Sequence, residues 1–495
     1  MTQVSVRDDE KKMKRIYVTT AIPYVNANPH VGHALEFVQT DALARFYRAT
    51  GYDVYFSSGS DENSLKNVQA AEAEGVKTDA LVKKYADRFE SLKDALNLTF
   101  DVFNRTATKE HFAGAQKLWS LCKEEDIYKK NYRGLYCVGC EAFYTPSEIV
   151  DGKCLEGHTN IDEIEEENYF FKLSNYQKYL DDLIQTDRLK IVPQTKKHEV
   201  LSFIRQGLED FSISRSVARA HSWGVPVPGD ETQIMYVWFD ALVTYLTALG
   251  FGRRPGGASG PEGKDEDLYK KYWIDNKNRL HVIGKGIIRF HAVYWPAMLA
   301  SAGLPLPTDE FVHGYITVEG QKISKSLGNV IDPFELVEKF GKEAVRFYLL
   351  REIPAWGDGD FSLTRFHDLY NGELANGIGN LVARVARLAS DTNLALPEKK
   401  NFTFKKVVLE NLKNFRFDQA MIGLWEEISV LDKKINAEKP WELEGAKLKK
   451  VITPIAQEIR EIAFNLGPFL PETSEVILTQ FTGKISVEKP LFPRI

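Results

Sequence analysis

The chain has 495 residues, 43% hydrophobic and 27% charged, so it is long enough to bury several cores, and about three domains are expected. Its formal net charge of -5 excludes bulk electrostatic attraction to nucleic acid, so any contact with RNA must use local patches. The sequence has no apolar run of about 18 residues, and its polar start lacks the apolar core of a signal peptide. We therefore expect a cytoplasmic protein that makes no membrane contact.

Residues 16–61 carry the pattern of a strand, a turn, a helix and a second strand. Residues 16–22 are an apolar, β-branched run without helical period, and the turn PYVNANPHVGH follows. From Val31 to Gly51 apolar residues recur at intervals of three and four, and residues 53–57 then indicate a second strand. The short connections predict a β-α-β unit with parallel strands, in which ligands bind where strands end and helices begin.

The turn places His30, Gly32 and His33 at the start of the predicted helix. Unpaired backbone N–H groups and the positive end of the helix dipole favour an anion there, and two imidazoles add hydrogen-bond donors. Gly32 has no side chain, which would let a base or a phosphate approach the backbone. Taken alone, the HVGH string also fits an ordinary helix start with two solvated histidines.

A second motif, GQKISKSLGN, occupies residues 320–329, after an apolar strand predicted over residues 311–318. Within it Lys322 and Lys325 bracket Ser324, and glycines lie on both sides. A mobile loop with two ammonium groups can close on a triphosphate and neutralise charge that develops at phosphorus. Taken alone, the motif also fits a basic surface loop.

Three of the four cysteines are clustered, in the segments CVGC and CLEGH. The arrangement C-x2-C-x13-C-x3-H suits a tetrahedral zinc site, whose ligands would be Cys137, Cys140, Cys154 and His158. Free thiols or a redox pair are the alternatives that this spacing favours less. The remaining Cys122 lies in a helical apolar pattern and is expected to be a buried apolar residue.

Together, HVGH and KISKS resemble the two signature motifs of the class I aminoacyl-tRNA synthetases. The segments AIPYVNANPHVGH, YVWFDAL, IGKGIIRFHAVYWPAML and FVHGYITVEGQKISKSLGN resemble, more narrowly, the methionyl-tRNA synthetases. The resemblance runs from Arg15 to about Pro471. It implies an α/β protein in which a Rossmann-type parallel-sheet catalytic domain is split by a zinc-knuckle insertion and followed by an all-α helix-bundle anticodon-binding domain.

The expected domain boundaries follow from this resemblance and from the pattern of elements. They are residues 1–114 for the first half of the catalytic domain, 115–222 for the insertion with its knuckle at about 132–160, 223–331 for the second half with the KISKS loop, 332–370 for a linking helical segment, and 371–495 for the helix bundle. We expect one amphipathic helix over residues 335–350, after a start near Asp332, and no strand between residue 370 and the C-terminal tail.

The resemblance implies a methionine-tRNA ligase that works in two steps. The carboxylate of L-methionine attacks the α-phosphorus of ATP to give methionyl-adenylate and pyrophosphate, and the 3′ adenosine of methionine tRNA, elongator or initiator, then takes the methionyl group. No protein nucleophile is needed, so the site must align the reactants and stabilise the transferring phosphoryl group, with Mg2+ accompanying ATP. The matching catalytic residues are His30, His33, Lys322 and Lys325, and Gly32, Gly284 and Ser324 add contacts to ATP.

A methionine pocket is implied by the same match. Asp61 corresponds to the carboxylate that holds the substrate ammonium, and the other matching positions are Ala21, Ile22, Tyr24, Trp238, Leu242, Tyr245, Phe290, His291 and Trp295. Aromatic edges favour contact with sulfur by ~0.3 to 1.5 kcal/mol, although such residues are also common in ordinary cores. The chain departs from many relatives at Asn63, where they have histidine, and at Gly286, where they have an aspartate that contacts the ribose.

Anticodon recognition is implied for the C-terminal bundle. Asn380 and Arg384 lie four apart and so share one helix face, and Trp441 follows Pro440 beyond the end of the long helix. The matching family positions contact the CAU anticodon, by stacking and by hydrogen bonds to base edges. The alternative is that Trp441 fills a core and that Arg384 is a surface ion-pair partner.

Two other functions remain open at this stage. One is a class I synthetase for cysteine, leucine, isoleucine or valine, and the other is a nucleotidylyltransferase for a small metabolite or a tRNA-binding protein whose catalytic fold has lost activity. The pocket residues disfavour the synthetases, and the helix bundle disfavours the nucleotidylyltransferase. The presence of both motif lysines and both motif histidines disfavours the inactive tRNA-binding protein. Because the sequence ends soon after the bundle, we expect a monomer.

Overall fold

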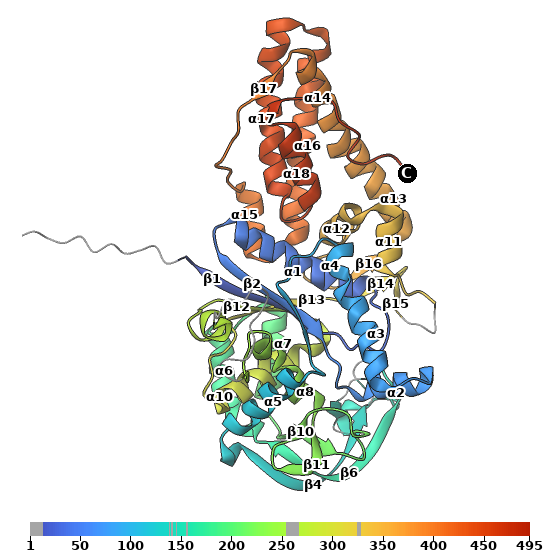
Figure 1. The fold of residues 1–495 in the computed structure, drawn as a ribbon, viewed down its shortest axis with the longest axis vertical. Coiled ribbons are helices and arrows are strands. Elements are labelled where there is room, and N and C mark those ends of the chain that lie inside the picture. The colour runs from blue at the N-terminus through green and yellow to red at the C-terminus, as the bar shows by residue number, and fades with distance from the viewer. Residues whose placement is uncertain are drawn as a thin grey trace, which may run out of the picture.

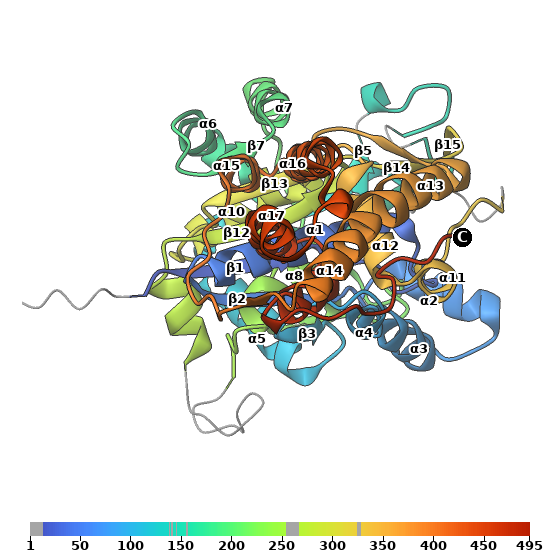
Figure 2. The ribbon, with the colours of Figure 1, turned by 90° about the horizontal axis from the view of Figure 1, so that it is seen from above.

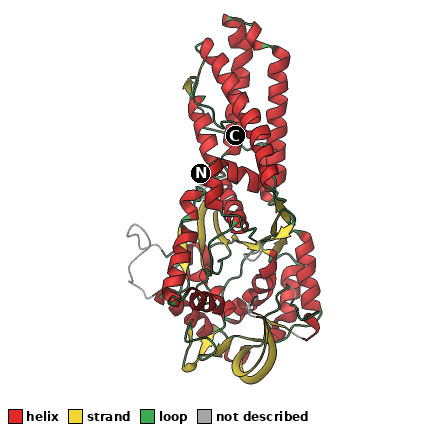
Figure 3. Ribbon diagram, turned by 90° about the vertical axis from the view of Figure 1, so that its right-hand side faces the viewer, coloured by secondary structure: helices red, strands yellow, loops and turns green. Residues whose placement is uncertain are grey.

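The computed structural model describes residues 13–137, 139, 142–144, 146–154, 157–253, 267–323 and 328–495, which form one elongated molecule (Figure 1). A mixed α/β body occupies one end, and a helical region rises from it (Figure 3). No helix in the described ranges is long and apolar enough to cross a membrane.

A six-stranded parallel sheet forms the centre of the body, with the strand order β3-β2-β1-β12-β13-β7. Its strands are β1 (Arg15–Thr20), β2 (Asp53–Ser60), β3 (Val102–Arg105), β7 (Lys190–Val192), β12 (Arg279–Gly284) and β13 (Asp309–His313). The strand order reverses between β1 and β12. In an open parallel sheet ligands bind outside the carboxyl ends of the strands at such a point.

Helix α1 (Val31–Ala49) connects β1 to β2, as the pattern of residues 16–61 predicts. Its buried face includes Ala34, Leu35, Val38 and Ala42, which recur at helical spacing. The helices α2 (Leu65–Glu74), α3 (Thr78–Glu90) and α4 (Leu92–Ala95) follow β2.

A second sheet is formed by residues that lie, in sequence, between strands β3 and β12 of the parallel sheet. It is antiparallel, with the order β5-β4-β6-β8, and consists of β4 (Ile127–Cys137), β5 (Ala142–Tyr144), β6 (Ile161–Phe171) and β8 (Phe211–Ser212). It lies between α5 (Lys109–Leu121) and the second half of the body, together with α6 (Gln177–Gln185) and α7 (Gln194–Arg205). Strand β7, however, lies inside the range 115–222 expected for the insertion and pairs with β13. The strand pairing therefore corrects that range: residues 190–192 belong to the parallel sheet.

A glycine divides the strand expected over residues 311–318. The structure has β13 in the parallel sheet and β14 (Ile316–Val318) in a separate sheet with β15 (Gln321–Lys322) and β16 (Gly359–Phe361). Between them, a Cβ atom on Gly314 would lie 1.8 Å from the carbonyl oxygen of Gly357. The close approach of these two backbones ends the strand, and only glycine allows it.

Another glycine divides the helix expected over residues 335–350. Helix α11 (Pro333–Phe340) ends at Gly341, whose φ is 81°, and α12 (Lys342–Arg351) begins immediately after it. The predicted start is confirmed, because the side chain of Asp332 accepts a hydrogen bond from the N–H of Phe334.

After the insertion, residues 237–247 and 285–301 each form several short helical elements and not one continuous helix. They form α8 (Val237–Ala241), α9 (Thr244–Thr247), the 3-10 turn η5 (Lys285–Ile287), the π-helix η6 (Phe290–Tyr294) and α10 (Trp295–Ser301). These short elements pack on one face of the parallel sheet and carry most of the residues expected to line the methionine pocket.

The C-terminal region is helical. A π-helix, η8 (Tyr370–Gly379), leads into α14 (Asn380–Asp391), α15 (Lys406–Lys413), α16 (Phe417–Glu438), α17 (Gly445–Leu466) and α18 (Pro471–Gln480). Figure 2 shows α16 and α17 nearly end-on above the sheet. Two short strands, β17 (Ala395–Leu396) and β18 (Gly483–Lys484), pair with each other, so the expectation of no strand here is wrong at residues 395–396.

A buried ion pair joins this region to the body. Arg346 of α12 and Asp41 of α1 are 2.8 Å apart, and neither side chain is exposed. The guanidinium also donates to the carbonyl oxygens of Leu96, Pro468 and Phe469. Burial alone would raise the pKa of Asp41, but neighbouring arginines outweigh it and hold the pKa below its usual value. One arginine thus connects α1, α12 and the turn between α17 and α18.

Candidate active site

The two histidines of the first motif are held by the start of α1. His30 is the N-cap residue, and its Nδ1 accepts a hydrogen bond from the N–H of Gly32 at 3.1 Å. The N–H of His30 in turn donates to Nδ1 of His33 at 3.1 Å. Because each Nδ1 is an acceptor, each neutral ring carries its proton on Nε2, which is free to donate to a ligand.

Burial keeps both rings neutral. It lowers the pKa of His30 to about 4 and the pKa of His33 well below its usual value. The rings stack with centroids 3.8 Å apart. A Cβ atom on Gly32 would lie 3.0 Å from Cε1 of His30, so a side chain there would displace that ring. The motif therefore offers neutral hydrogen-bond donors at the helix start, not fixed positive charges.

A tight hairpin positions the second motif. Strands β14 and β15 are joined by Glu319 and Gly320, which both have positive φ, 49° and 74°, as in the mirror-image turns that suit two-residue hairpins. The N–H of Gly320 donates to the carboxylate of Asp360 at 2.8 Å. Lys322 is exposed on β15. The predicted ligands Ser324 and Lys325 lie outside the described residues.

The end of the second motif meets the start of the first. The N–H of Val31 donates to the carbonyl oxygen of Ile331 at 3.0 Å. Gly284 ends β12, next to β1, and its Cα faces the ring of His313, with 3.6 Å from an ideal Cβ to Cε1. The structure therefore brings His30, Gly284 and the exit from the KISKS loop to the carboxyl edge of the sheet, where its strand order reverses.

One stabilising interaction at this edge was not predicted from the sequence. Glu36 of α1 accepts from the N–H of Ala21 at 2.8 Å, and its other carboxylate oxygen lies 2.8 Å from Nε2 of His313. Nδ1 of His313 donates to the carbonyl oxygen of Gly314. The sequence offered no clear signal, because the helical neighbours of Glu36, among them His33, Gln39 and Thr40, are also polar. The interaction fixes the end of β1, where two pocket residues lie, against α1 and β13.

Aromatic side chains meet next to this edge. Trp238 of α8 stacks on Phe290 of η6, with centroids 3.8 Å apart and an interplanar angle of 4°. Tyr24 contacts Trp238 edge-on at 6.4 Å. Leu242 is buried in the same cluster, Ala21 is buried, and Ile22 is half-buried. The structure thus gathers these predicted pocket residues.

A second group of aromatics lies deeper. Nδ1 of His291 donates to the carbonyl oxygen of Ile287, so Nε2 is the acceptor for the hydroxyl of Tyr245, at 2.7 Å. Burial lowers the pKa of His291 to about 4, which keeps the ring neutral. Trp295 is fully buried, with its ring 6.2 Å from that of Tyr245. His291 also contacts Trp238, so both groups belong to one cluster.

Asp61 lies at the end of β2, beside this cluster. It is 2% exposed, and its N–H donates to the carbonyl oxygen of Pro23 in a bridge that pairs Tyr24 with Asp61. Its carboxylate accepts from the N–H of Asn63 at 3.2 Å. A buried carboxylate therefore adjoins the aromatic cluster, so a polar and an apolar surface lie side by side here.

Three of the four predicted metal ligands also come together. The sulfur atoms of Cys137 and Cys154 are 3.6 Å apart, and Nδ1 of His158 lies 3.7 Å and 3.6 Å from them. Such a group could hold a metal ion. Gly139 is required beside it, because a Cβ atom there would lie 2.5 Å from the ring of His158. The fourth predicted ligand, Cys140, is outside the described residues, whereas Cys122 is buried as expected.

The anticodon candidates lie on the helical region. Arg384 and Trp441 are neighbours, with the guanidinium carbon 5.7 Å from the centroid of the ring. Trp441 is 52% exposed, which excludes a core role for it. Arg384 pairs with Asp432 at 2.8 Å, as the alternative reading expects. Asn380 is exposed on the same helix as Arg384, and Pro440, which precedes Trp441, is buried.

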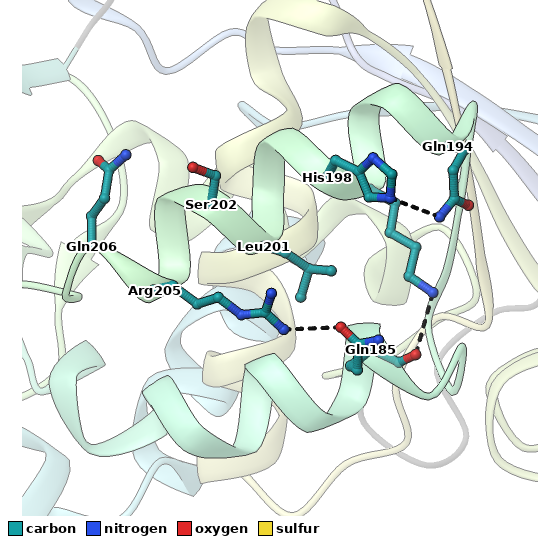
Figure 4. Close-up of a pocket in the computed structure, with 8 residues that line it drawn as sticks. Gln185, Gln194, His198, Leu201, Ser202, Arg205 and Gln206 are labelled. Carbon is teal, nitrogen blue, oxygen red and sulfur yellow. Dashed lines mark hydrogen bonds between the residues drawn. The ribbon is translucent and has the colours of Figure 1, made fainter.

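A surface hollow of about 530 Å³ lies between α6 and α7 and contains none of the motif residues (Figure 4). Its two cations are already paired, Arg205 with Asp181 and Lys197 with Asp187, each at 2.6 or 2.7 Å. The hollow is thus a polar groove between two helices, and it lies apart from the motif residues.

Comparison with known proteins agrees with this geometry. The model of the family "tRNA synthetases class I (M)" matches residues 16–162 and 146–386. The methionine-tRNA ligase of Clostridium acetobutylicum is 37% identical over 97% of this chain and 78% of its own length, and that of Brucella suis is 38% identical over 94% and 91%. The Mycobacterium tuberculosis methionyl-tRNA synthetase in complex with methionyl-adenylate superposes with a TM-score of 0.87 at 37% identity, over 97% of this chain and all of that one. The chain belongs to the methionyl-tRNA synthetases of class I.

Proposed function

We propose that this chain activates methionine with ATP and transfers it to methionine tRNA. The observation that carries the proposal is the convergence of the HVGH turn, the KISKS exit and the Asp61 carboxylate beside one aromatic cluster. The similar Mycobacterium tuberculosis enzyme binds methionyl-adenylate, the product of the first step.

ATP would bind at the carboxyl edge of the sheet. The Nε2–H groups of His30 and His33 would donate to its phosphates, and Gly32 and Gly284 leave the backbone accessible. Lys322, Ser324 and Lys325, with Mg2+, would neutralise the charge that develops as the methionine carboxylate attacks the α-phosphorus. Lys322 already lies at the base of the loop, on a hairpin anchored by Asp360.

Methionine would lie between Asp61 and the aromatic cluster. Its ammonium pairs with the buried carboxylate, and its unbranched, polarisable side chain suits the aromatic edges. Because the hydroxyl of Tyr245 donates its proton to Nε2 of His291, it has no proton left to donate to the substrate. The residues proposed to line the pocket are Ala21, Ile22, Tyr24, Trp238, Leu242, Tyr245, Phe290, His291 and Trp295.

The helical region would act as an anticodon-binding helix bundle. Its exposed indole, Trp441, can stack on an unpaired base of the CAU anticodon, and Asn380 and Arg384 can reach base edges from the same face. Arg384 would exchange its partner Asp432 for RNA, which costs little because exposed ion pairs contribute about 0.2 to 1 kcal/mol.

One structural Zn2+ would be bound by Cys137, Cys140, Cys154 and His158. A tetrahedral site with metal–sulfur distances near ~2.3 Å places its ligand atoms about 3.8 Å apart, close to the three separations in the structure. Elemental analysis of the purified protein should find one zinc per chain. A protein that is fully folded and active with no zinc contradicts this assignment.

The activity is tested by amino-acid-dependent exchange of pyrophosphate into ATP, measured with each of the twenty amino acids. We expect exchange with methionine alone at micromolar to millimolar concentrations. Exchange with cysteine, leucine, isoleucine or valine instead would support the related synthetases, and no exchange at all would contradict the proposal.

The role of the KISKS loop is tested by Lys325→Ala. Because the ammonium group acts on charge that develops in the transition state, adenylate formation should slow by about 10² to 10³-fold while the affinity for methionine changes little. Lys406→Ala, an exposed lysine of α15, is the matched control and should change neither. Equal losses of rate and affinity would assign the loop a structural role.

A further inference from the structure

Asn63 joins two parts of the body that are far apart in the sequence. Its Nδ2 donates to Oδ2 of Asp240 at 2.6 Å and to the carbonyl oxygen of Thr106 at 3.2 Å. Asn63 and Asp240 are 5% and 1% exposed. The amide nitrogen faces both partners, because the carbonyl oxygen of Thr106 can only accept a hydrogen bond.

The two ends of this connection lead to opposite ends of the proposed substrate. The backbone N–H of Asn63 holds a carboxylate oxygen of Asp61, the residue proposed to bind the ammonium group. Asp240 lies on α8, two residues after Trp238, which stacks on Phe290 in the wall of the proposed side-chain pocket. Asn63 therefore links the loop that binds one end of methionine to the helix that contacts the other.

We propose that Asp240 is a positioning residue for methionine, which acts through Asn63 to fix the Asp61 carboxylate at a set distance from the Trp238 wall. The inference rests on the proposed function. It assigns a role to a residue that contacts neither ATP nor methionine in that proposal.

The energetics of Asp240 support a role beyond packing. Its Oδ1 has no hydrogen-bond partner among the described residues, and a buried carboxylate that is only half satisfied costs stability. Burial raises the pKa of Asp240 to about 7, although the hydrogen bond from Asn63 and the nearby charge of Arg215 lower it. A costly group of this kind is expected where its hydrogen bond orients a functional neighbour.

The test uses a pair of substitutions at position 63 in the full chain. Asn63→Leu removes the donor at similar volume, whereas Asn63→His restores a ring N–H toward Asp240. In the exchange assay, Asn63→Leu should raise the KM for methionine by about 10- to 100-fold, the effect of losing a hydrogen bond to a charged group. The KM for ATP should stay within about twofold, and Asn63→His should recover most of the methionine affinity.

A double-mutant cycle identifies Asp240 as the partner. Asp240→Leu should raise the KM for methionine as Asn63→Leu does. The KM of the double variant should not exceed the higher of the two single-variant values, because both substitutions remove the same interaction. The double variant also leaves neither polar group buried alone, so it supplies the result if a single variant does not fold. Asn168→Ala removes an equally buried amide from β6 and should leave both KM values unchanged.

Three results would overturn the inference: additive effects in the cycle, equal rises in the KM for ATP and for methionine, or no recovery with Asn63→His. Each presupposes a wild-type protein that shows methionine-dependent exchange. A wild-type protein without that exchange instead contradicts the proposed function itself.

Discussion

Two arginine–aspartate ion pairs in this molecule have the same N–O distance but differ in their exposure to solvent. Arg346 and Asp41 are 2.8 Å apart at the base of the helical region, and both are fully buried. Arg384 and Asp432 are also 2.8 Å apart, but their side chains are 28% and 39% exposed. The first pair connects structural elements, and the second lies beside the exposed Trp441. The distance between the charged groups therefore does not determine whether an ion pair stabilises the fold or is available to a ligand.

The difference follows from solvation. Removing one partner of a buried pair leaves an uncompensated charge and costs about 3 to 5 kcal/mol, whereas an exposed pair contributes about 0.2 to 1 kcal/mol. Arg346 is fixed by four acceptors, three of which are backbone carbonyls. Among the described residues, the acceptors of Arg384 are the side chains of Asp432 and Asn436, which can exchange for a ligand. Buried polarity holds the domains together, and exposed polarity is available for recognition.

The largest expected effect is on stability. Arg346→Met should lower the free energy of unfolding by about 3 to 5 kcal/mol, because Asp41 loses one of its two arginine partners and the carbonyl oxygens of Leu96, Pro468 and Phe469 lose this buried donor. Arg384→Met is the matched control and should lower it by less than about 1 kcal/mol. Thermal and urea unfolding of both variants measure the difference. A similar loss of unfolding free energy in the two variants would contradict the assignment of different roles to the two ion pairs.

The next effect is on tRNA charging. Trp441→Ala should reduce aminoacylation of methionine tRNA by about 10- to 100-fold, which corresponds to ~1.4 to 2.8 kcal/mol of lost stacking. Methionine-dependent pyrophosphate exchange should be unaffected, because Trp441 lies on the helical region and contacts none of the proposed active-site residues. Trp356→Ala, another exposed tryptophan at 40%, serves as the control for loss of a surface indole. Normal charging by the folded Trp441→Ala protein would reject the anticodon assignment.

The smallest effect is the response to salt. Raising the ionic strength from 0.1 M to 1 M shortens the screening length from about 10 Å to about 3 Å, so it should weaken the exposed pair and leave the buried one nearly unchanged. The stability difference between wild type and Arg384→Met, of at most about 1 kcal/mol, should therefore disappear at 1 M salt. The penalty of Arg346→Met should persist. If both penalties vanished, Arg346 and Asp41 would be accessible to solvent.

Local patterns predicted much of the fold. The β1-α1-β2 unit follows from apolar periodicity within 46 residues of sequence, and the cysteine cluster follows from ligand spacing. Each of these signals lies within one short segment. The start of α11 at Asp332 was predicted for the same reason, because its capping residue and Pro333 are adjacent.

Non-local contacts account for the remainder. Strand β7 has three residues and is defined by its pairing with β13, which follows more than a hundred residues later. The break at Gly314 depends on the backbone of Gly357, and the Asn63–Asp240 hydrogen bond spans 177 residues. The pocket residues were expected only through family resemblance, because an aromatic residue in a sequence does not reveal whether it lines a site or fills a core.

The π-helix η8 sets the direction in which the proposed anticodon-binding face, Asn380 and Arg384, points. It covers Tyr370–Gly379 and continues directly into α14, so Asn380 and Arg384 inherit their orientation from it. Each residue of an α-helix advances the side-chain direction by about 100°, and a π-turn contains extra residues relative to an α-turn. The wide turns therefore set the angle between the body and this proposed face. Deleting one residue from η8 should rotate Asn380 and Arg384 by about 100° about the axis of α14, away from their present direction.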